Sequence, residues 1–135
     1  MRDYPESENR QQRPRYTGLP TFMRTTYRED MEGLDIALVG IPFDGGVTNR
    51  TGARHGPREI RNQSSLMRMI NQAPGSNPYE LCSIADFGDA GVQKPCELTV
   101  ALQEIEEFYQ MGHQSGTVPV SAGGDHSVTL PIFRA

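Results

Sequence analysis

The stretch best suited to chemistry is a glycine pair followed by an acid, a histidine and a serine, Gly123-Gly124-Asp125-His126-Ser127. Paired glycines let the backbone turn sharply and let another group approach closely, so the histidine after them is presented at the turn. A neutral imidazole there is able to coordinate a divalent metal. The simpler alternative is that His126 merely caps the next helix or fills a polar niche. The spacing alone leaves both interpretations open, because no second histidine lies near His126.

Acidic side chains also follow two earlier apolar runs. Asp44 begins a glycine-rich loop after the first run, and Asp86 and Asp89 close the second. The carboxyl ends of parallel strands meet at one edge of an open α/β sheet, where ligands gather. We therefore expect all these polar groups to converge on one rim. Asp89 is expected to stabilise its loop rather than to bind a metal, and Asp125 to support the histidine loop.

Three apolar runs of strand length predict the sheet that positions these residues. The runs are continuous or nearly so, which suits strands buried on both faces of a parallel sheet. They occupy residues 36–41, 81–87 and 118–122. The alternation of strands with helical patterns predicts an α/β fold with right-handed crossovers. A sheet of three strands leaves an edge unpaired, so we expect the three predicted strands to form part of a larger sheet.

Helical patterns separate the predicted strands. Residues 98–109 repeat apolar side chains at i, i+3, i+4 and i+7, which predicts an amphipathic helix. Pro57 and Glu59 indicate that another helix starts at residue 56. Residues 128–133 begin a third helix. The expected inward stripe of the helix from residue 56 consists of Ile60, Met67 and Ile70.

The chain divides into an N-terminal arm, residues 1–33, and an α/β segment, residues 34–135. The arm is polar and shows neither a period of 2 nor one of 3.6, so we expect it to be partly disordered. Disorder is expected before Arg15, whereas residues 16–23 hold enough apolar surface to dock on a neighbouring surface.

These motifs in combination resemble the ureohydrolase family, which includes arginases and agmatinases. The resemblance is to the N-terminal portion of agmatinase-type members and covers residues 15–135. The matching stretches are residues 40–44, 49–61, 86–89 and 123–127. The resemblance implies a three-layer α/β/α sandwich with a mainly parallel sheet, of which only the first three strands are present here.

The resemblance also implies a binuclear manganese (Mn²⁺) centre. In this family a metal-bridging hydroxide attacks a guanidinium carbon, and an amine departs with urea. Two divalent ions about 3.5–4 Å apart can lower the pKa of a shared water. Only His126 matches a metal-ligand position of the family, and the remaining ligands belong to two later motifs that this sequence lacks. We assign no catalytic residue, leave the substrate-binding residues unknown and expect the 135-residue chain alone to be catalytically incomplete.

The resemblance implies a small guanidino substrate. Agmatine, which would give putrescine and urea, is the first expectation, and guanidinobutyrate or guanidinopropionate comes next. The loop at residues 46–50 does not distinguish them. Arg54 and His55 are expected to support the loop and the helix start, with contact to substrate or to a neighbouring subunit as the alternative.

A second hypothesis makes the chain a non-catalytic truncated partner or regulatory subunit of a ureohydrolase oligomer. A reading frame that continues beyond Ala135 into motifs of Asp-x-His-x-Asp and Asp-x-Asp character would favour the enzyme instead.

Composition narrows the class of protein further. Thirteen Lys and Arg residues against seventeen Asp and Glu give a net charge of −4, which offers no broad basic surface for nucleic acid. No run approaches the length of a membrane span, and no secretory signal is visible. Cys82 and Cys96 lack metal-ligand spacing and are expected to be reduced structural thiols. We expect a cytoplasmic protein, and the resemblance implies a homo-oligomer, trimer or hexamer, of the complete protein.

Overall fold

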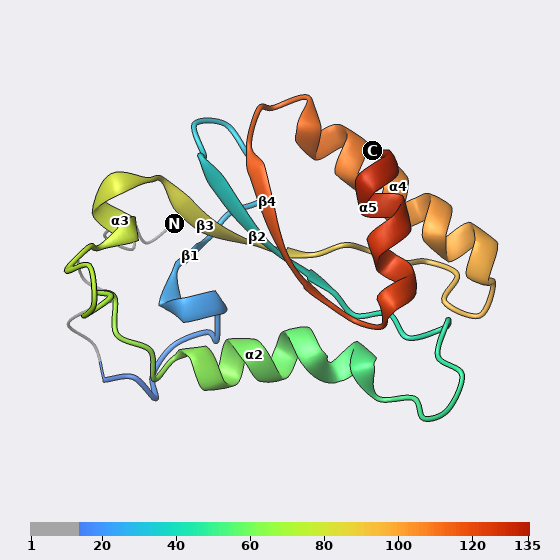
Figure 1. The fold of residues 1–135 in the computed structure, drawn as a ribbon, viewed down its shortest axis with the longest axis horizontal. Coiled ribbons are helices and arrows are strands. Elements are labelled where there is room, and N and C mark those ends of the chain that lie inside the picture. Colours follow the sequence, from blue (N-terminus) through green and yellow to red (C-terminus); the bar gives the residue numbers. More distant parts are fainter. Residues whose placement is uncertain (1–13) are drawn as a thin grey trace.

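A computed structural model describes residues 14–135 as a parallel sheet with helices on both faces (Figure 1). The expected disorder before Arg15 falls on residues outside this range, apart from Pro14. The strands are β1 (Thr26–Tyr27), β2 (Ile36–Ile41), β3 (Ile84–Asp89) and β4 (Val118–Gly123). The helices are α2 (Gly56–Ser64), α3 (Pro78–Leu81), α4 (Leu98–His113) and α5 (Thr129–Arg134), with short 3-10 turns η1 (Phe22–Arg24), η2 (Ala53–His55) and η3 (His126–Val128).

The sheet has the order β1-β3-β2-β4, and every neighbouring pair is parallel. β2 lies between β3 and β4 and is buried from its second residue to its last, because its sequence is apolar on both faces. The register with β4 runs without interruption from Ile36 opposite Val118 to Ile41 opposite Gly123. The carboxyl ends of β2, β3 and β4 therefore lie at one edge of the sheet, and we call the loops that leave this edge the rim.

The sheet contains one strand more than the three that the sequence predicts. β1 lies within the arm and pairs with β3, with Thr26 opposite Ala85 and Tyr27 opposite Asp86. Two residues are too few to show an alternating pattern, which explains why the arm shows no strand period. β1 covers only part of the outer edge of β3.

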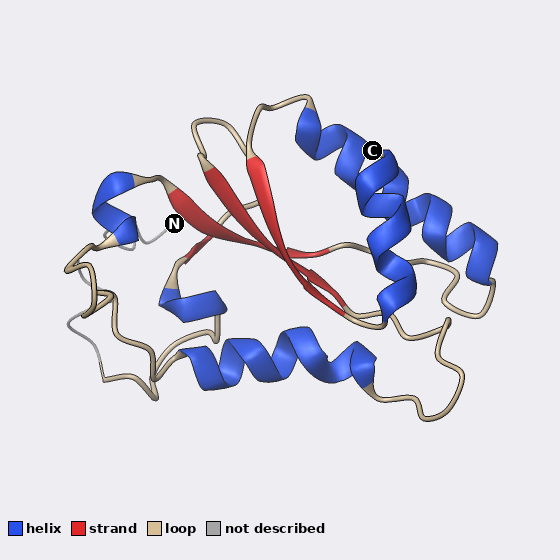
Figure 2. Cartoon of the chain, in the orientation of Figure 1, coloured by secondary structure: helices blue, strands red, loops and turns tan. Residues whose placement is uncertain are grey.

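Helix α4 covers one face of the sheet, as its apolar period predicts. Ala101, Ile105 and Tyr109 are buried and form one core with Ala37, Val39 and Ile41 of β2. Figure 2 shows α4 and α5 together on this face of the sheet and α2 on the opposite face. Alternate residues of a strand point to opposite faces. Gly40 accordingly faces α2, where a Cβ on it would lie 2.9 Å from the Pro57 side chain.

The predicted inward stripe of α2 is wrong. Ile60 is 46% exposed, and Met67 and Ile70 lie beyond the end of the helix at Ser64 and are more than half exposed. The buried positions of α2 are Pro57 and Ser64. They are seven residues apart, and Arg61 lies between them on the same face, with its side chain only 12% exposed. A polar contact, rather than an apolar stripe, fixes this helix to the sheet.

The second predicted strand begins later than its apolar run. Residues Pro78–Leu81 form α3, because Pro78 stands in the first helical position and the Asn77 side chain accepts a hydrogen bond from the Tyr79 N–H at 3.1 Å. Leu81 is 73% exposed in consequence. Cys82 follows α3 and does not lie in the strand. Both cysteines are free thiols, Cys82 half-buried and Cys96 exposed.

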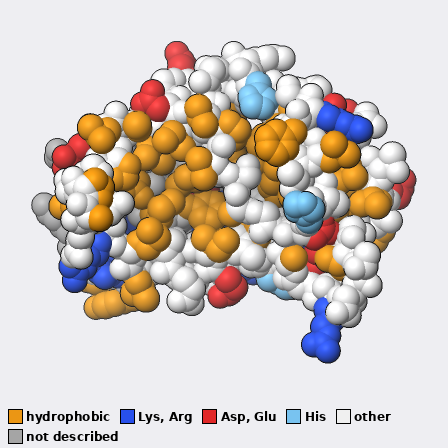
Figure 3. Space-filling view, viewed as in Figure 1, with side chains coloured by type: hydrophobic (Ala, Val, Ile, Leu, Met, Phe, Trp, Pro, Cys, Tyr) orange, Lys and Arg blue, Asp and Glu red, His pale blue; other side chains and the backbone are white. Residues whose placement is uncertain are grey.

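The face of the sheet next to α2 is only partly covered. Figure 3 shows hydrophobic side chains gathered across this side of the molecule. Val118 and Val120 of β4, which point to the same face as Gly40, are 59% and 51% exposed. Within residues 14–135, no helix is long and apolar enough to cross a membrane.

Candidate functional site

The histidine loop is fixed to the end of β2 by a close backbone approach at Gly124. A Cβ on Gly124 would lie 2.3 Å from the carbonyl oxygen of Phe43 and 2.6 Å from that of Ile41. The Gly124 and Asp125 N–H groups donate to these same two carbonyls, at 3.3 Å to Ile41 and 2.9 Å to Phe43. Glycine is therefore required here by space, and the turn after β4 is held against the turn after β2.

Asp125 supports this loop, as its place beside the histidine predicts. One carboxylate oxygen, Oδ2, accepts a hydrogen bond from the Gly46 N–H at 2.7 Å and so reaches the loop after β2. The other, Oδ1, accepts from the Ser127 N–H at 2.8 Å and from the Ser127 hydroxyl at 2.5 Å, which caps η3. Both oxygens of Asp125 are thus used in positioning the residues on either side of His126.

His126 is exposed at the first position of η3. Its side chain makes no hydrogen bond or ion pair with any residue between 14 and 135. The imidazole is therefore held out at the rim by its neighbours and is itself free to take a ligand.

Metal binding needs several such groups, and the described residues do not gather them. Residues 14–135 contain no group of three or more His, Cys, Asp or Glu side chains that could hold a metal ion. The side chains of Asp44 and Asp86 are 0% and 1% exposed and are already bonded to arginines. These residues alone do not fit a binuclear centre, and of the ligand positions that the sequence suggested within residues 14–135 only His126 is available.

Asp44 closes the long loop after β2. Its carboxylate accepts hydrogen bonds from the Arg54 Nε–H at 2.6 Å, the Gly52 N–H at 2.6 Å and the Arg54 N–H at 3.3 Å. The side-chain bond from Arg54, followed by the backbone bond from Gly52, lowers the pKa of Asp44 to about 2. The same bond raises the pKa of Arg54. Arg54 thus supports the loop, as expected, and Asp44 remains ionised behind it.

A second ion pair, centred on Arg61, holds α2 to the end of β3. The Arg61 Nε and Nη2 groups donate to the two oxygens of Asp86 at 2.8 and 2.9 Å, Nη1 donates to Asp89 at 2.6 Å, and Nη2 also reaches the Gly88 carbonyl at 2.8 Å. Burial acts to lower the pKa of Arg61, but the hydrogen bonds that Arg61 donates to Asp86 and Asp89 outweigh burial, and the pKa is raised. Asp89 is therefore occupied in a structural contact, as predicted.

The arm docks on this ion pair. The Phe22 N–H donates to Asp86 at 2.9 Å, and the centroid of the Phe22 ring lies 4.1 Å from the guanidinium carbon of Arg61. The Met23 N–H donates to the Ser64 hydroxyl at 2.8 Å. Only part of the arm docks as the sequence predicts, since Phe22 is buried but Tyr16 and Leu19 are exposed.

The arm, α2 and the ends of β2 and β3 border an open hollow of about 480 Å³, which we call the rim pocket. It is lined by Pro20, Pro42, Arg54, His55, Arg58, Arg61 and Asp89. Sequence reasoning did not find this pocket, because its walls come from four separated segments. The available signal was the spacing of Pro57, Arg61 and Ser64, which places a charged residue on the inward face of α2.

The chain belongs to the arginase family, whose model matches residues 34–135. It is 51% identical over 133 residues to the guanidinopropionase of Pseudomonas aeruginosa, covering 98% of this chain and 42% of that protein. It is 41% identical over 121 residues to the mitochondrial agmatinase of Gallus gallus, covering 90% of this chain and 35% of that protein.

The solved structure of proclavaminate amidino hydrolase from Streptomyces clavuligerus superposes with a TM-score of 0.84 at 31% identity, covering 90% of this chain and 40% of that one. The family and the α/β class predicted from the motifs are confirmed. The relatives are hydrolases of guanidino compounds, and the chain spans about two fifths of the length of those it matches.

Proposed function

We propose that the complete protein is a metal-dependent hydrolase that cleaves a guanidino C–N bond and releases urea and an amine. The observation that carries this proposal is the histidine loop. Gly124 and Asp125 hold an unbonded imidazole at the rim, where ligands gather in α/β sheets. Membership of the arginase family supports the same reaction.

We propose that His126 is one ligand of a binuclear manganese centre in the complete protein. Imidazole and carboxylate groups are ligands that manganese accepts. When bound, such a metal pair supplies a hydroxide near neutral pH. The contribution of this chain is positional, because Asp125 and Gly124 fix the loop and leave the imidazole unbonded. Because the described residues contain no group of three or more metal ligands, the 135-residue chain alone is expected to be inactive.

For the substrate, we place a guanidino acid ahead of agmatine, which reverses the order expected from the motifs. The support is the 51% identity to a guanidinopropionase, against 41% to an agmatinase. Guanidinopropionate and guanidinobutyrate carry a carboxylate where agmatine carries an ammonium group. The two classes therefore require opposite charges at the far end of the substrate site.

His126→Ala in the complete protein tests the reaction and the ligand together. We expect the loss of urea release and of bound metal without a change in fold, because His126 is exposed and makes no contact that holds the loop. Metal content, urea release and thermal unfolding would be measured on the same preparation. His113→Ala, at the exposed end of α4, is the matched control. Two bound metals and full turnover in His126→Ala would remove His126 from the site.

The alternative of a non-catalytic partner subunit is favoured by one observation, the lack of a three-ligand group within residues 14–135. Co-expression of the 135-residue chain with a complete ureohydrolase subunit tests it. A stable mixed oligomer with altered urea release would support a regulatory role, and two separate species would exclude it.

We further propose a cytoplasmic protein that assembles as a homo-oligomer, trimer or hexamer, when complete, with no nucleic-acid partner. The net charge of −4 supports the last point. Sedimentation of the complete protein measures its assembly, and a monomer would contradict the proposal.

A further inference from the structure

The arm passes from α2 to the edge of the sheet through one sharp turn. We call its docked stretch, residues 20–28, the strap, and it contains η1 and β1. Met23 and Arg24 in η1 have φ angles of 52° and 59°, and within residues 14–135 they are the two residues other than glycine with a positive φ. A left-handed conformation crowds the Cβ against the following carbonyl oxygen, which raises the free energy of any residue except glycine. The turn of the strap is therefore strained.

Contacts with two different elements offset this strain. The Phe22 N–H donates to Asp86 of β3 at 2.9 Å, and the Met23 N–H donates to the Ser64 hydroxyl of α2 at 2.8 Å. The Phe22 ring is 3% exposed and lies against Arg61. Strained residues persist only where the surrounding contacts determine their conformation. The left-handed turn therefore depends on the bonds to Asp86 and Ser64.

Two further hydrogen bonds close the turn on itself. The Thr21 hydroxyl donates to the Thr25 carbonyl at 2.7 Å, and the Thr25 hydroxyl donates to the Phe22 carbonyl at 2.8 Å. Both threonines are buried. These bonds join residues within the strap and do not tie it to α2 or to β3. The turn is thus built to move as one unit.

Beyond the turn, only a short strand attaches the strap to the sheet. β1 pairs with β3 over two residues, and the Arg28 N–H then donates to the Asp86 carbonyl at 2.9 Å. β1 lies at the edge of the sheet, whereas β2 is paired on both sides. Release of β1 therefore leaves β3, β2 and β4 paired with one another. A segment with few buried contacts at the edge of a fold opens at lower free energy than the core.

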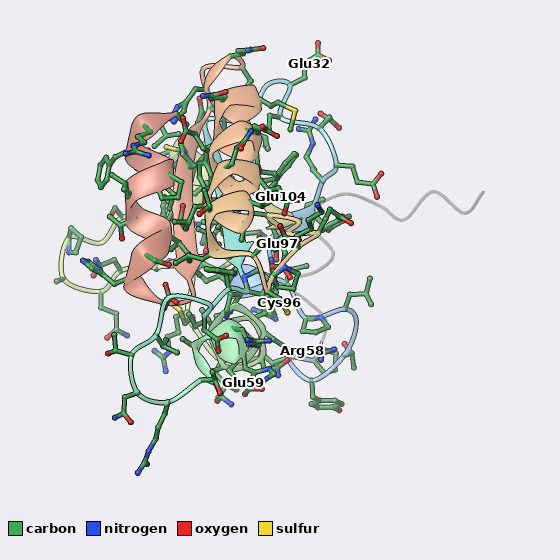
Figure 4. The ribbon with its side chains drawn as sticks, turned by 90° about the vertical axis from the view of Figure 1, so that its right-hand side faces the viewer. Glu32, Arg58, Glu59, Cys96, Glu97 and Glu104 are labelled. Atoms are coloured by element: carbon green, nitrogen blue, oxygen red, sulfur yellow. The ribbon has the colours of Figure 1, made fainter. Side chains whose placement is uncertain are left out.

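The position of the strap determines how open the rim pocket is. Pro20, at the start of the strap, lines this pocket together with Arg61. Figure 4 shows the arm alongside α2, on the flank from which Arg58 projects. Lifting the strap removes Pro20 from the pocket wall and uncovers the ion pair of Arg61 with Asp86.

We propose that the strap opens and closes over the end of β3 while the rest of the sheet stays folded, and that the left-handed turn at Met23 and Arg24 sets the balance between the two states. The closed state makes the contacts with Asp86 and Ser64 and carries the strain. The open state loses the contacts and is relieved of the strain. This conformational device does not depend on the proposed hydrolase function.

Hydrogen exchange in the complete protein tests whether the strap opens separately. We expect the protection factor of the Phe22 amide to be at least about tenfold lower than that of the Val39 amide in β2. Ser64→Ala removes the acceptor of the Met23 N–H and should lower the Phe22 value about fivefold further, without changing Val39. Ser65→Ala is the matched control, because this serine bonds Asn62 instead of the strap. Equal protection of Phe22 and Val39, or equal effects of the two serine variants, would overturn the proposal.

A comparison of glycine with alanine tests the strain itself. Met23→Gly and Met23→Ala lose the same contacts beyond the Cβ, but only glycine adopts the left-handed conformation without strain. We expect the Phe22 amide to be about threefold better protected in Met23→Gly than in Met23→Ala. The same pair of substitutions at Tyr27 in β1, where φ is not positive, should give the reverse order, because glycine there only adds flexibility. If Met23→Gly protects Phe22 no better than Met23→Ala, the turn does not set the balance and the proposal fails.

Discussion

At the residue scale, the acids of the rim differ from the histidine in how fully they are bonded. Asp44 accepts three hydrogen bonds, and both oxygens of Asp125 accept bonds that position the histidine loop. His126 accepts and donates none within the described part of the chain. An acid that is saturated by arginine and backbone N–H groups is a poor metal ligand, whereas an unbonded imidazole at a fixed loop is available.

Asp44 gives the rim a pH dependence with a definite sign. Its pKa is about 2 in the folded chain against an ordinary 3.8, so the folded state binds the proton less readily than the unfolded state. The stability contributed by the ionised group is therefore complete above pH 4 and is lost as the pH falls toward 2. Urea unfolding of the complete protein and of Asp44→Asn should differ at pH 6, and the difference should shrink below pH 4.

Glu32→Gln is the control for this pH series, because Glu32 is exposed and has no partner among the described residues. It should leave the unfolding curve unchanged at every pH. A difference between the complete protein and Asp44→Asn that stays constant from pH 6 to pH 2 would show that the Arg54 contact does not depend on the carboxylate charge.

The histidine loop was the part of the site that could be predicted. Its glycines and histidine are consecutive, so sequence alone shows a sharp turn that presents an imidazole. The structure shows that a glycine is needed at position 124 for a different reason. Gly124 is needed for the close approach to the Phe43 carbonyl, and neither glycine of the pair has a positive φ.

At the element scale, helices α4 and α2 show what sequence periodicity can and cannot find. The inward face of α4 is apolar, so its period predicted the buried residues Ala101, Ile105 and Tyr109. The inward face of α2 consists of a proline, an arginine and a serine, so a search for apolar residues selected its exposed side chains. The ion pair of Arg61 depends on β3, which no local pattern in α2 can reveal.

Removing one partner of the Arg61–Asp86 ion pair should lower the free energy of unfolding more than its share in the variant that lacks both partners. Arg61→Met leaves the buried carboxylate of Asp86 without its cation, and we expect the free energy of unfolding of the complete protein to fall by about 3–5 kcal/mol. The double variant Arg61→Met/Asp86→Asn should be less destabilised than the sum of the two single variants, because it leaves no unpaired charge. Chemical denaturation of the four proteins measures the coupling.

Hydrogen exchange in the arm gives a second measurement of the Arg61–Asp86 ion pair. Because Asp86 accepts the Phe22 N–H and Arg61 lies against the Phe22 ring, Arg61→Met should increase hydrogen exchange at the Phe22 amide. Arg68→Gln should change neither exchange nor stability, since Arg68 has no partner in the described chain. Additive single-variant effects would show that Arg61 and Asp86 act independently.

At the scale of the whole molecule, the sheet is unevenly covered. Sequence order predicted its parallel class because buried strands alternate with helical segments. It could not place β1, which is two residues long and lies in the arm. β4 forms the other edge of the sheet, and its outer side has no strand partner within residues 14–135. Several of the exposed apolar side chains lie on this edge and on α5, among them Val118, Val120, Leu130 and Phe133.

This uneven cover predicts how the 135-residue chain behaves by itself in solution. An unpaired strand edge offers free N–H and C=O groups to another chain, and an exposed apolar face adds a hydrophobic gain on contact. We therefore expect the isolated chain to associate at micromolar concentration, measured by sedimentation velocity. Val118→Lys/Val120→Lys should reduce the association, because charged side chains on an edge strand oppose pairing. The control is Ile70→Lys, which removes an equally exposed side chain away from β4. If the isolated chain sediments as a cooperative monomer, or if Ile70→Lys has the same effect, the β4 edge is not the surface through which it associates.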